Sequence, residues 1–216
     1  MPEAPEIEAL SIVLNKLGFQ TKRHGKHLFI DELLEDWHFG LRGRVKIAHT
    51  INSGGITTYN ITKYSNAMSG LVRKVDSFDE MVLNHLLGID WLTATPAELE
   101  SVINVWKTRG RVLGSILLDQ SEICGIGVAW GSEICHRANV HPGVKANAVN
   151  LDGILPAMLE IRREIMATYN KFLRDQQDLC KFVEEWFLNL YKIREMKAYK
   201  KGKSVDVASR TWWVVE

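Results

Sequence analysis

The chain has 216 residues, a formal net charge of +1 at pH 7 and a hydrophobic fraction of 46%. This length allows one large domain or two small ones, each with its own core. The near-neutral charge excludes nucleic-acid binding through bulk electrostatics alone, so any such surface must be local. The sequence shows no signal peptide and no apolar run long enough to span a bilayer, so we expect a soluble intracellular protein with no membrane partner.

The chain contains three cysteines, Cys124, Cys135 and Cys180, and none of them has a CxxC spacing. An odd number without that spacing indicates neither a zinc ribbon nor a disulfide framework. We therefore interpret them as small buried residues in a reducing compartment.

The first part of the chain predicts one helix followed by a small sheet. Apolar residues at helical spacing predict a helix over residues 3–17, which Gly18 ends. From residue 19 to about residue 75, short alternating segments separated by turns predict antiparallel strands. The candidate strands are 26–30, 35–39, 44–48 and 56–61. Residues 66–80 carry no clear pattern.

From about residue 80 the pattern is helical. Thr95 followed by Pro96 is a good helix start, with threonine as the N-cap and proline at the first helical position. A basic segment over residues 192–203 leads into two short strand candidates at the end of the chain. The other predicted helices cover 111–118, 129–138, 156–175 and 178–190, and the final strands cover 204–207 and 211–215.

The first six residues carry the main chemical signal. If Met1 is removed, Pro2 becomes an N-terminal secondary amine with a pKa near ~8, against ~10.4 for lysine, so more of it is nucleophilic at neutral pH. Attack on a sugar aldehyde carbon would give a cationic iminium, which is Schiff-base chemistry. Glu3 and Glu6 share a helix face beside this amine and could protonate a sugar ring oxygen or move protons. Taken alone, these residues favour a plainer interpretation, in which proline and glutamate simply start a helix.

Two further positions are candidate phosphate contacts. Gly125 and Gly127 precede a predicted helix whose first N–H groups could bind a phosphate, although a tight turn explains the glycines equally well. Lys26 stands at the start of a predicted strand and could meet a phosphate as a point charge, although such a lysine is more often solvated.

Two others are candidates for contact with an opened duplex. Arg210 lies at the tip of the final hairpin, next to Trp212 and Trp213, and could bind phosphate or lie beside a flipped base. A basic run is more usually a solvated face. Leu41 lies at a turn between strands and could fill the gap left by an extruded base, although a lone exposed leucine ordinarily needs no explanation.

Together and in this order, these residues resemble the formamidopyrimidine-DNA glycosylase / endonuclease VIII family of base-excision repair enzymes. Each motif is weak alone, but the ordered set covers nearly the whole chain. The matching elements are Met1-Pro2-Glu3-Ala4-Pro5-Glu6, Arg23-His24-Gly25-Lys26-His27-Leu28-Phe29, His38-Phe39-Gly40-Leu41-Arg42-Gly43, Leu117-Leu118-Asp119-Gln120, Gly125-Ile126-Gly127, Ser132-Glu133-Ile134, His141-Pro142 and Ser209-Arg210-Thr211.

The resemblance implies an α+β fold in three parts. Residues 1–80 would form an N-terminal helix with a small antiparallel β-sandwich. Residues 81–190 would form a helical domain with a helix–two-turn–helix motif, and residues 191–216 a basic β-hairpin finger. Damaged DNA, duplex or single-stranded, would lie in the cleft between them, and we expect a monomer in the nucleus of a eukaryote or the cytoplasm or nucleoid of a bacterium.

The resemblance also implies an activity, that of a bifunctional DNA glycosylase and AP lyase that removes oxidised or ring-opened bases. Pro2 would attack C1′ and expel the base, after which the iminium would drive β- and δ-elimination. Glu3 would donate a proton to the sugar and Glu6 would support it. Lys26 completes the implied catalytic set, because it would hold a phosphate beside the lesion.

The implied DNA contacts continue beyond the catalytic group. Lys26 and Arg210 would hold the phosphates that flank the lesion, and Leu41 would fill the void in the base stack. Gly127 would lie close to the DNA backbone. Val128 stands where the family normally has an asparagine that contacts DNA.

Several departures qualify the resemblance. The finger region has none of the four zinc-binding cysteines usual in the family, as in its zinc-less members, so we expect no metal and no cofactor. The N-terminal domain is shortened, and the arginine and phenylalanine that usually help fill the DNA gap are not recognisable. The space between residues 183 and 203 is small for a loop over 8-oxoguanine, which favours ring-opened, hydantoin or oxidised pyrimidine lesions.

Two other classes of function remain open on these grounds. The first is a DNA-binding protein of the same fold with reduced or lost glycosylase activity. The second is a helical interaction domain with no nucleic-acid role.

Overall fold

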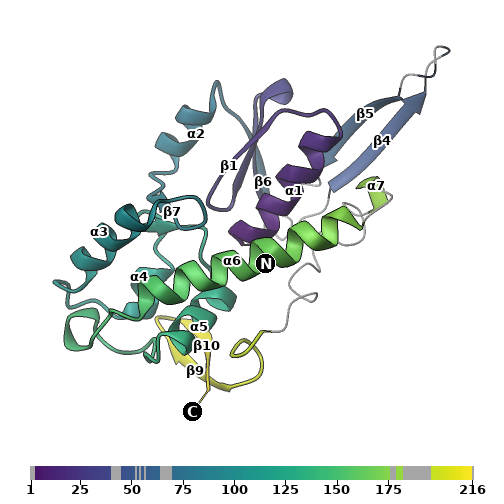
Figure 1. Cartoon of the computed structure of the whole chain (residues 1–216). Coiled ribbons are helices and arrows are strands. Elements are labelled where there is room, and N and C mark those ends of the chain that lie inside the picture. Colours follow the sequence, from purple (N-terminus) through teal and green to yellow (C-terminus); the bar gives the residue numbers. More distant parts are fainter. Residues whose placement is uncertain are drawn as a thin grey trace. The chain divides into compact units, whose positions relative to one another are not determined.

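The computed structural model describes residues 3–39, 45–51, 53, 55, 57–63, 70–175, 179–181 and 196–215 (Figure 1). These residues form helices and mainly antiparallel sheets, so the predicted α+β class is confirmed. The chain divides into two compact units, described separately below: Met1–Asn84 with Thr168–Ile193, and His85–Ala167 with Arg194–Glu216. The functional division at residues 80 and 190 stays a prediction.

The first unit begins with helix α1, Ala4–Lys16, as the apolar spacing predicted. Glu3 precedes it in an extended conformation, and proline occupies its first turn, where a missing N–H costs nothing. Ile7, Leu10 and Leu14 are fully buried on its inner face. Gly18 ends the helix with a φ of 96°, a conformation that side chains disfavour.

Two antiparallel sheets follow α1. The larger has the strand order β1-β2-β3-β6, and Leu28, Trp37 and Phe39 from it are buried in the core. The smaller is a hairpin of two strands, β4 and β5. The bounds are β1 Thr21–His24, β2 His27–Ile30, β3 Glu35–Phe39, β4 Val45–Ile51, β5 Thr57–Lys63 and β6 Gly70–Lys74, with a 3-10 turn at Asp31–Leu33.

One strand lies in the segment without a clear sequence pattern, residues 66–80, and one helix begins in it. Strand β6 pairs with β3, and helix α2, Phe78–Asn84, follows it. Met81 of α2 is fully buried against Phe29 and Val75. The helix is therefore held by a small apolar cluster rather than by a long amphipathic stripe.

The second unit is mainly helical. Thr95 caps helix α3, Pro96–Trp106, as predicted: its Oγ1 accepts from the Glu98 N–H at 3.3 Å, and its own N–H donates to the Glu98 carboxylate at 2.7 Å. The last part of the long helix α6, from Thr168, belongs to the first unit. The remaining helices are α4 Leu113–Leu117, α5 Val128–Arg137, α6 Ile154–Arg174 and α7 Leu179–Lys181, with a 3-10 turn at Ala146–Ala148.

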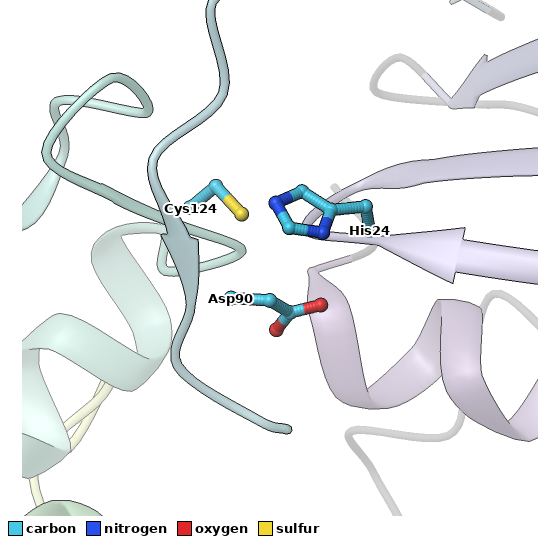
Figure 2. Close-up of side chains that lie close together, drawn as sticks. All are labelled: His24, Asp90 and Cys124. Carbon is cyan, nitrogen blue, oxygen red and sulfur yellow. The ribbon is translucent and has the colours of Figure 1, made fainter. Parts of the chain in front are cut away.

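The second unit also contains a short parallel pair of strands, β7 Ile89–Asp90 and β8 Ile123–Cys124. Asp90 and Cys124 are partners in its register (Figure 2). His24, also labelled in Figure 2, ends β1 of the first unit. The predicted helix over 178–190 falls largely outside the described residues. None of the described helices has the length and apolar character needed to cross a membrane.

The chain ends in the predicted hairpin, β9 Lys203–Val207 and β10 Arg210–Val214. Trp212 is fully buried, and a Cβ added to Gly114 or Gly131 would come within 2.9 Å of its indole ring. These two glycines therefore leave the space that the indole fills. In Figure 1, β10 lies beside α5.

Polar contacts also attach the C-terminal hairpin, and the residues just before it, to α5. The Ser132 hydroxyl accepts the Trp213 N–H at 3.2 Å. The Glu133 carboxylate is fully buried and accepts three consecutive backbone N–H groups, from residues 197 to 199, at 2.7–3.0 Å. The Ser132-Glu133 motif is therefore the anchor of the C-terminal hairpin.

Candidate active site

The two acids at the start of α1 form a buried, hydrogen-bonded pair. Glu3 and Glu6 expose only 5% and 3% of their surface. The Glu3 backbone N–H donates to Oε2 of Glu6 at 2.9 Å. The hydroxyl of Tyr169, from the last part of α6, donates to Oε1 of Glu6 at 2.8 Å. Both oxygens of the Glu6 carboxyl are thus held.

This environment raises the pKa of Glu6 to about 7. Burial is the main cause, because it penalises the charged form, and the nearby Glu3 carboxylate adds to it. The hydrogen bonds from Tyr169 and from backbone N–H groups oppose the rise, because they favour the ionised form. A carboxyl group with a pKa near neutrality can both give and take a proton at physiological pH.

Lys26 lies in the tight turn between β1 and β2, next to Gly25, whose φ is 57°. The lysine is 7% exposed, so the interpretation of a solvated surface residue is wrong. Arg23 holds this turn to α1. Its Nε donates to the Glu8 carboxylate at 2.6 Å and its Nη1 donates to the Gly25 carbonyl at 2.9 Å. The turn that carries Lys26 and the helix that carries the acids are therefore braced together.

The Gly125–Gly127 segment is organised by one side chain. The Gln120 amide oxygen accepts the Gly125 N–H at 2.9 Å, and its nitrogen donates to the carbonyls of Leu118 and Ile126 at 3.0 and 3.1 Å. Gly125 has a φ of 93° and supplies the turn that favours glycine. Gly127 is extended and is the N-cap of α5, so its backbone conformation does not require glycine.

Val128 and Arg210 complete the described candidates. Val128 is the half-buried first residue of α5, with no side-chain hydrogen-bonding group. Arg210 is the exposed first residue of β10. It follows Ala208 and Ser209, which both have positive φ and turn the hairpin. Its side chain is thus presented at the hairpin turn, as predicted from the sequence.

The structure brings only some of the candidates into one unit. Glu3 and Glu6 contact each other, and Lys26 lies in the same unit. Gly127, Val128 and Arg210 belong to the other unit. Pro2 and Leu41 lie outside the described residues. Asp90 and Cys124 offer two candidate metal ligands in their own unit, fewer than the three or four protein ligands of a zinc site, so we assign no metal to this pair.

Two residues that hold the candidate residues in place, one in each unit, were not predicted from the sequence. Tyr169 fits the apolar stripe of α6, and nothing in the local sequence marks its hydroxyl as a partner of Glu6. Gln120 belongs to a recognised motif, but its role in holding the glycine segment depends on contacts made up to six residues away. A tyrosine has an apolar ring and a polar hydroxyl, so it can act as a core residue or as a hydrogen-bond donor, and only its neighbours in the fold decide which.

Comparison with known proteins gives one partial match in sequence and several complete matches in fold. No family model matches the chain. A formamidopyrimidine-DNA glycosylase of Corynebacterium efficiens is 32% identical over 69 residues, which are 32% of this chain and 24% of that protein. The match thus spans about a quarter of the curated relative.

The solved structures show the same fold over nearly the whole chain. MutM in complex with DNA that contains carbocyclic 8-oxo-G has a TM-score of 0.68 at 15% identity, covering 98% of this chain and 97% of that one. A Lactococcus lactis FPG mutant with Fapy-dG DNA has a TM-score of 0.71 at 14% identity, covering 99% and 98%. L. lactis Fpg with abasic-site DNA has a TM-score of 0.68 at 14% identity, covering 97% and 96%. The chain therefore has the fold of the formamidopyrimidine-DNA glycosylases, and the resemblance to that family in its sequence is confirmed.

Proposed function

We propose that this protein is a bifunctional DNA glycosylase and AP lyase of base excision repair, acting on oxidised or ring-opened bases. The observation that carries the proposal is the buried pair of Glu3 and Glu6, placed directly after a proline at position 2. Solved proteins of the same fold are described in complex with DNA that contains 8-oxo-G, Fapy-dG or an abasic site. DNA with a damaged base is therefore the proposed partner, in duplex or single-stranded form, with the protein acting as a monomer.

In the proposed reaction the Pro2 amine, freed by removal of Met1, attacks C1′ of the damaged nucleotide. The bond from C1′ to the base breaks as the new bond forms, and the base leaves with the electron pair. Glu3 donates a proton to the sugar oxygen, which opens the ring and gives an iminium. Loss of the C2′ proton then expels the 3′ phosphate, and a second elimination expels the 5′ phosphate.

The proposed role of Glu6 follows from its contacts. Its carboxyl holds the N–H of the peptide that joins residue 2 to Glu3. A carboxyl with a pKa of about 7 can also take up the proton that the Pro2 amine loses when it attacks C1′. We therefore propose that Glu6 positions this peptide and exchanges protons with the site.

Lys26 and Arg210 are the proposed phosphate contacts. Lys26 is buried in a braced turn, so its position is fixed before DNA binds and little side-chain freedom would be lost on binding. Arg210 is exposed at the hairpin turn and can form a bidentate contact with phosphate. Leu41 would fill the space of the extruded base, and Gly127 would let the DNA backbone approach α5.

Borohydride trapping tests this proposal. Wild-type protein is mixed with an oligonucleotide that contains one abasic site, and sodium borohydride reduces any iminium to a stable bond. A covalent protein–DNA band is expected on duplex or single-stranded substrate. Absence of the band on every lesion and strand type would overturn the proposal.

The second candidate function is a DNA-binding protein of this fold with reduced or lost activity. Val128 favours it, because it cannot make the hydrogen bond that an asparagine at the start of α5 would make. Loss of one hydrogen bond to a charged group costs about 1.5–3 kcal/mol, or roughly one to two decades in affinity or rate. Such a protein would retard DNA in a gel without being trapped by borohydride.

A further inference from the structure

We propose that Tyr169 is a positioning residue of the active site: its hydroxyl holds the Glu6 carboxyl so that Glu6 fixes the peptide between residue 2 and Glu3. The inference rests on the proposed function, since it assigns a role toward the proposed nucleophile. Tyr169 lies on α6, far along the chain from the first residues, and belongs to none of the motifs that carry the family resemblance.

The geometry places Glu6 between two donors. One oxygen of its carboxyl accepts the Tyr169 hydroxyl at 2.8 Å, and the other accepts the Glu3 N–H at 2.9 Å. That N–H is part of the peptide bond that follows the proposed nucleophile. A carboxyl held at one oxygen cannot rotate freely, so the hydroxyl restricts the direction from which its second oxygen meets the peptide.

Burial makes this arrangement rigid. Glu6 and Tyr169 are 3% and 0% exposed, so water does not compete for their hydrogen bond. Hydrogen bonds to an ionised acceptor in a site of low dielectric constant are stronger than those in water. The Tyr169–Glu6 bond is therefore well suited to hold the first turn of α1 in one conformation.

Among the groups around Glu6, the Tyr169 hydroxyl is the one that most favours the ionised carboxylate. Glu3 is the like-charged neighbour and disfavours ionisation of Glu6, whereas the hydrogen bonds from Tyr169 and from backbone N–H groups favour it. On the strands packed against α1, Arg23 is paired with Glu8 and His27 with Asp36, and Lys26 lies in the intervening turn. Loss of the Tyr169 hydroxyl should therefore move ionisation of Glu6 to higher pH.

A purely structural role is the competing explanation, because buried tyrosines usually find a hydrogen-bond partner. Tyr169→Phe keeps the ring and removes only the hydroxyl, so the packing of α6 is preserved. The test measures the rate of borohydride trapping on abasic-site DNA from pH 6 to pH 9 for wild type and Y169F. Tyr59→Phe on β5 is the matched control, since it makes the same chemical change at a tyrosine outside the site.

The expected result is a loss of about tenfold in the trapping rate of Y169F at pH 7, because loss of a hydrogen bond to the carboxylate raises the pKa of Glu6 and leaves less of it ionised to hold the peptide. The ratio of Y169F to wild type should rise toward one at pH 9, where Glu6 is ionised in both proteins. The titration of the amine cancels in this ratio. Y59F should follow wild type at every pH.

Glu6→Ala provides a second, independent measurement, because alanine leaves the Tyr169 hydroxyl no carboxyl to hold. If Tyr169 acts through the Glu6 carboxyl, Y169F should change the trapping rate much less in the E6A background than in wild type, and without a pH dependence. An equal loss in both backgrounds, or a Y169F/wild-type ratio that does not vary with pH, would overturn the inference. Failure of wild type itself to be trapped would overturn the proposed function instead, so the two failures are distinguishable.

Discussion

The Glu6 carboxyl accepts a hydrogen bond from the Tyr169 hydroxyl at 2.8 Å, although the two residues are 163 positions apart in the sequence. The contact joins the start of α1 to the last part of α6 within one compact unit. The second oxygen of the same carboxyl accepts the Glu3 N–H at 2.9 Å. Glu6, close to the proposed nucleophile in the sequence, is therefore held by a residue of a helix that lies far along the chain.

The first prediction concerns stability and pH. The pKa of Glu6 is about 7 in the folded protein against 4.5 for a free side chain, so the folded state binds the proton more tightly. Below about pH 4.5 Glu6 is protonated in both the folded and the unfolded state, so its titration does not lower the free energy of unfolding. Between about pH 4.5 and pH 7 the free energy of unfolding falls as pH rises, because only the unfolded state gains the freely solvated carboxylate.

Glu6→Gln removes this titration and can still make two hydrogen bonds, because its amide oxygen can accept the Glu3 N–H and its NH₂ group can donate to the Tyr169 hydroxyl oxygen. We expect E6Q to be more stable than wild type at pH 8, by on the order of 3 kcal/mol, and close to wild type at pH 4.5. Urea unfolding at the two pH values measures this difference. A stability gap that is the same at both pH values would contradict the high pKa of Glu6.

The agreement between sequence and structure is closest where the signal is local. The Thr95–Pro96 helix start depends on contacts with Glu98, three residues away, and was predicted correctly. The strand β6 escaped prediction because its place depends on pairing with β3, and the start of α2 escaped it because this short helix depends on the packing of Met81 against Phe29 and Val75. The acids and Lys26 were identified from motifs, but their burial and the role of Tyr169 require contacts between distant segments, which local patterns do not contain.

The second prediction concerns Val128 at the start of α5. Asparagine at this position would provide a hydrogen-bonding group for DNA, so Val128→Asn should raise the affinity or the trapping rate by roughly 10- to 100-fold. The measurement is the trapping rate at limiting enzyme concentration, with Val105→Asn on the exposed face of α3 as the control. An unchanged rate in V128N would show that Val128 does not limit contact with DNA.

The third prediction concerns the anchor of the hairpin. A Cβ at position 131 would lie 2.8 Å from the Trp212 ring, so Gly131→Ala should destabilise the protein by about 1–3 kcal/mol despite the better helix propensity of alanine. Gly110→Ala is the control, because its Cβ would meet nothing closer than 3.8 Å. Thermal unfolding compares the two variants, and equal melting temperatures would contradict the close packing of Trp212.

The fourth prediction concerns Arg210 at the hairpin turn. If its guanidinium binds a phosphate, Arg210→Ala should weaken DNA binding and lower the slope of log affinity against log salt by about one. Its side chain is exposed, so the melting temperature should change little. Titrations of labelled DNA at several salt concentrations measure the slope, with Arg210→Lys retaining most of it. A slope identical to that of wild type in R210A would exclude the phosphate contact.

The central claim is that the amine of Pro2 is the nucleophile, and one measurement tests it directly. The protein is trapped on abasic-site DNA with borohydride, the DNA and protein are digested, and mass spectrometry locates the remaining sugar adduct. The account predicts an adduct on the peptide that begins at Pro2, with Met1 absent, and little or no trapping of Pro2→Gly. An adduct on Lys26 or another lysine, or a trapped protein that still begins with Met1, would contradict it.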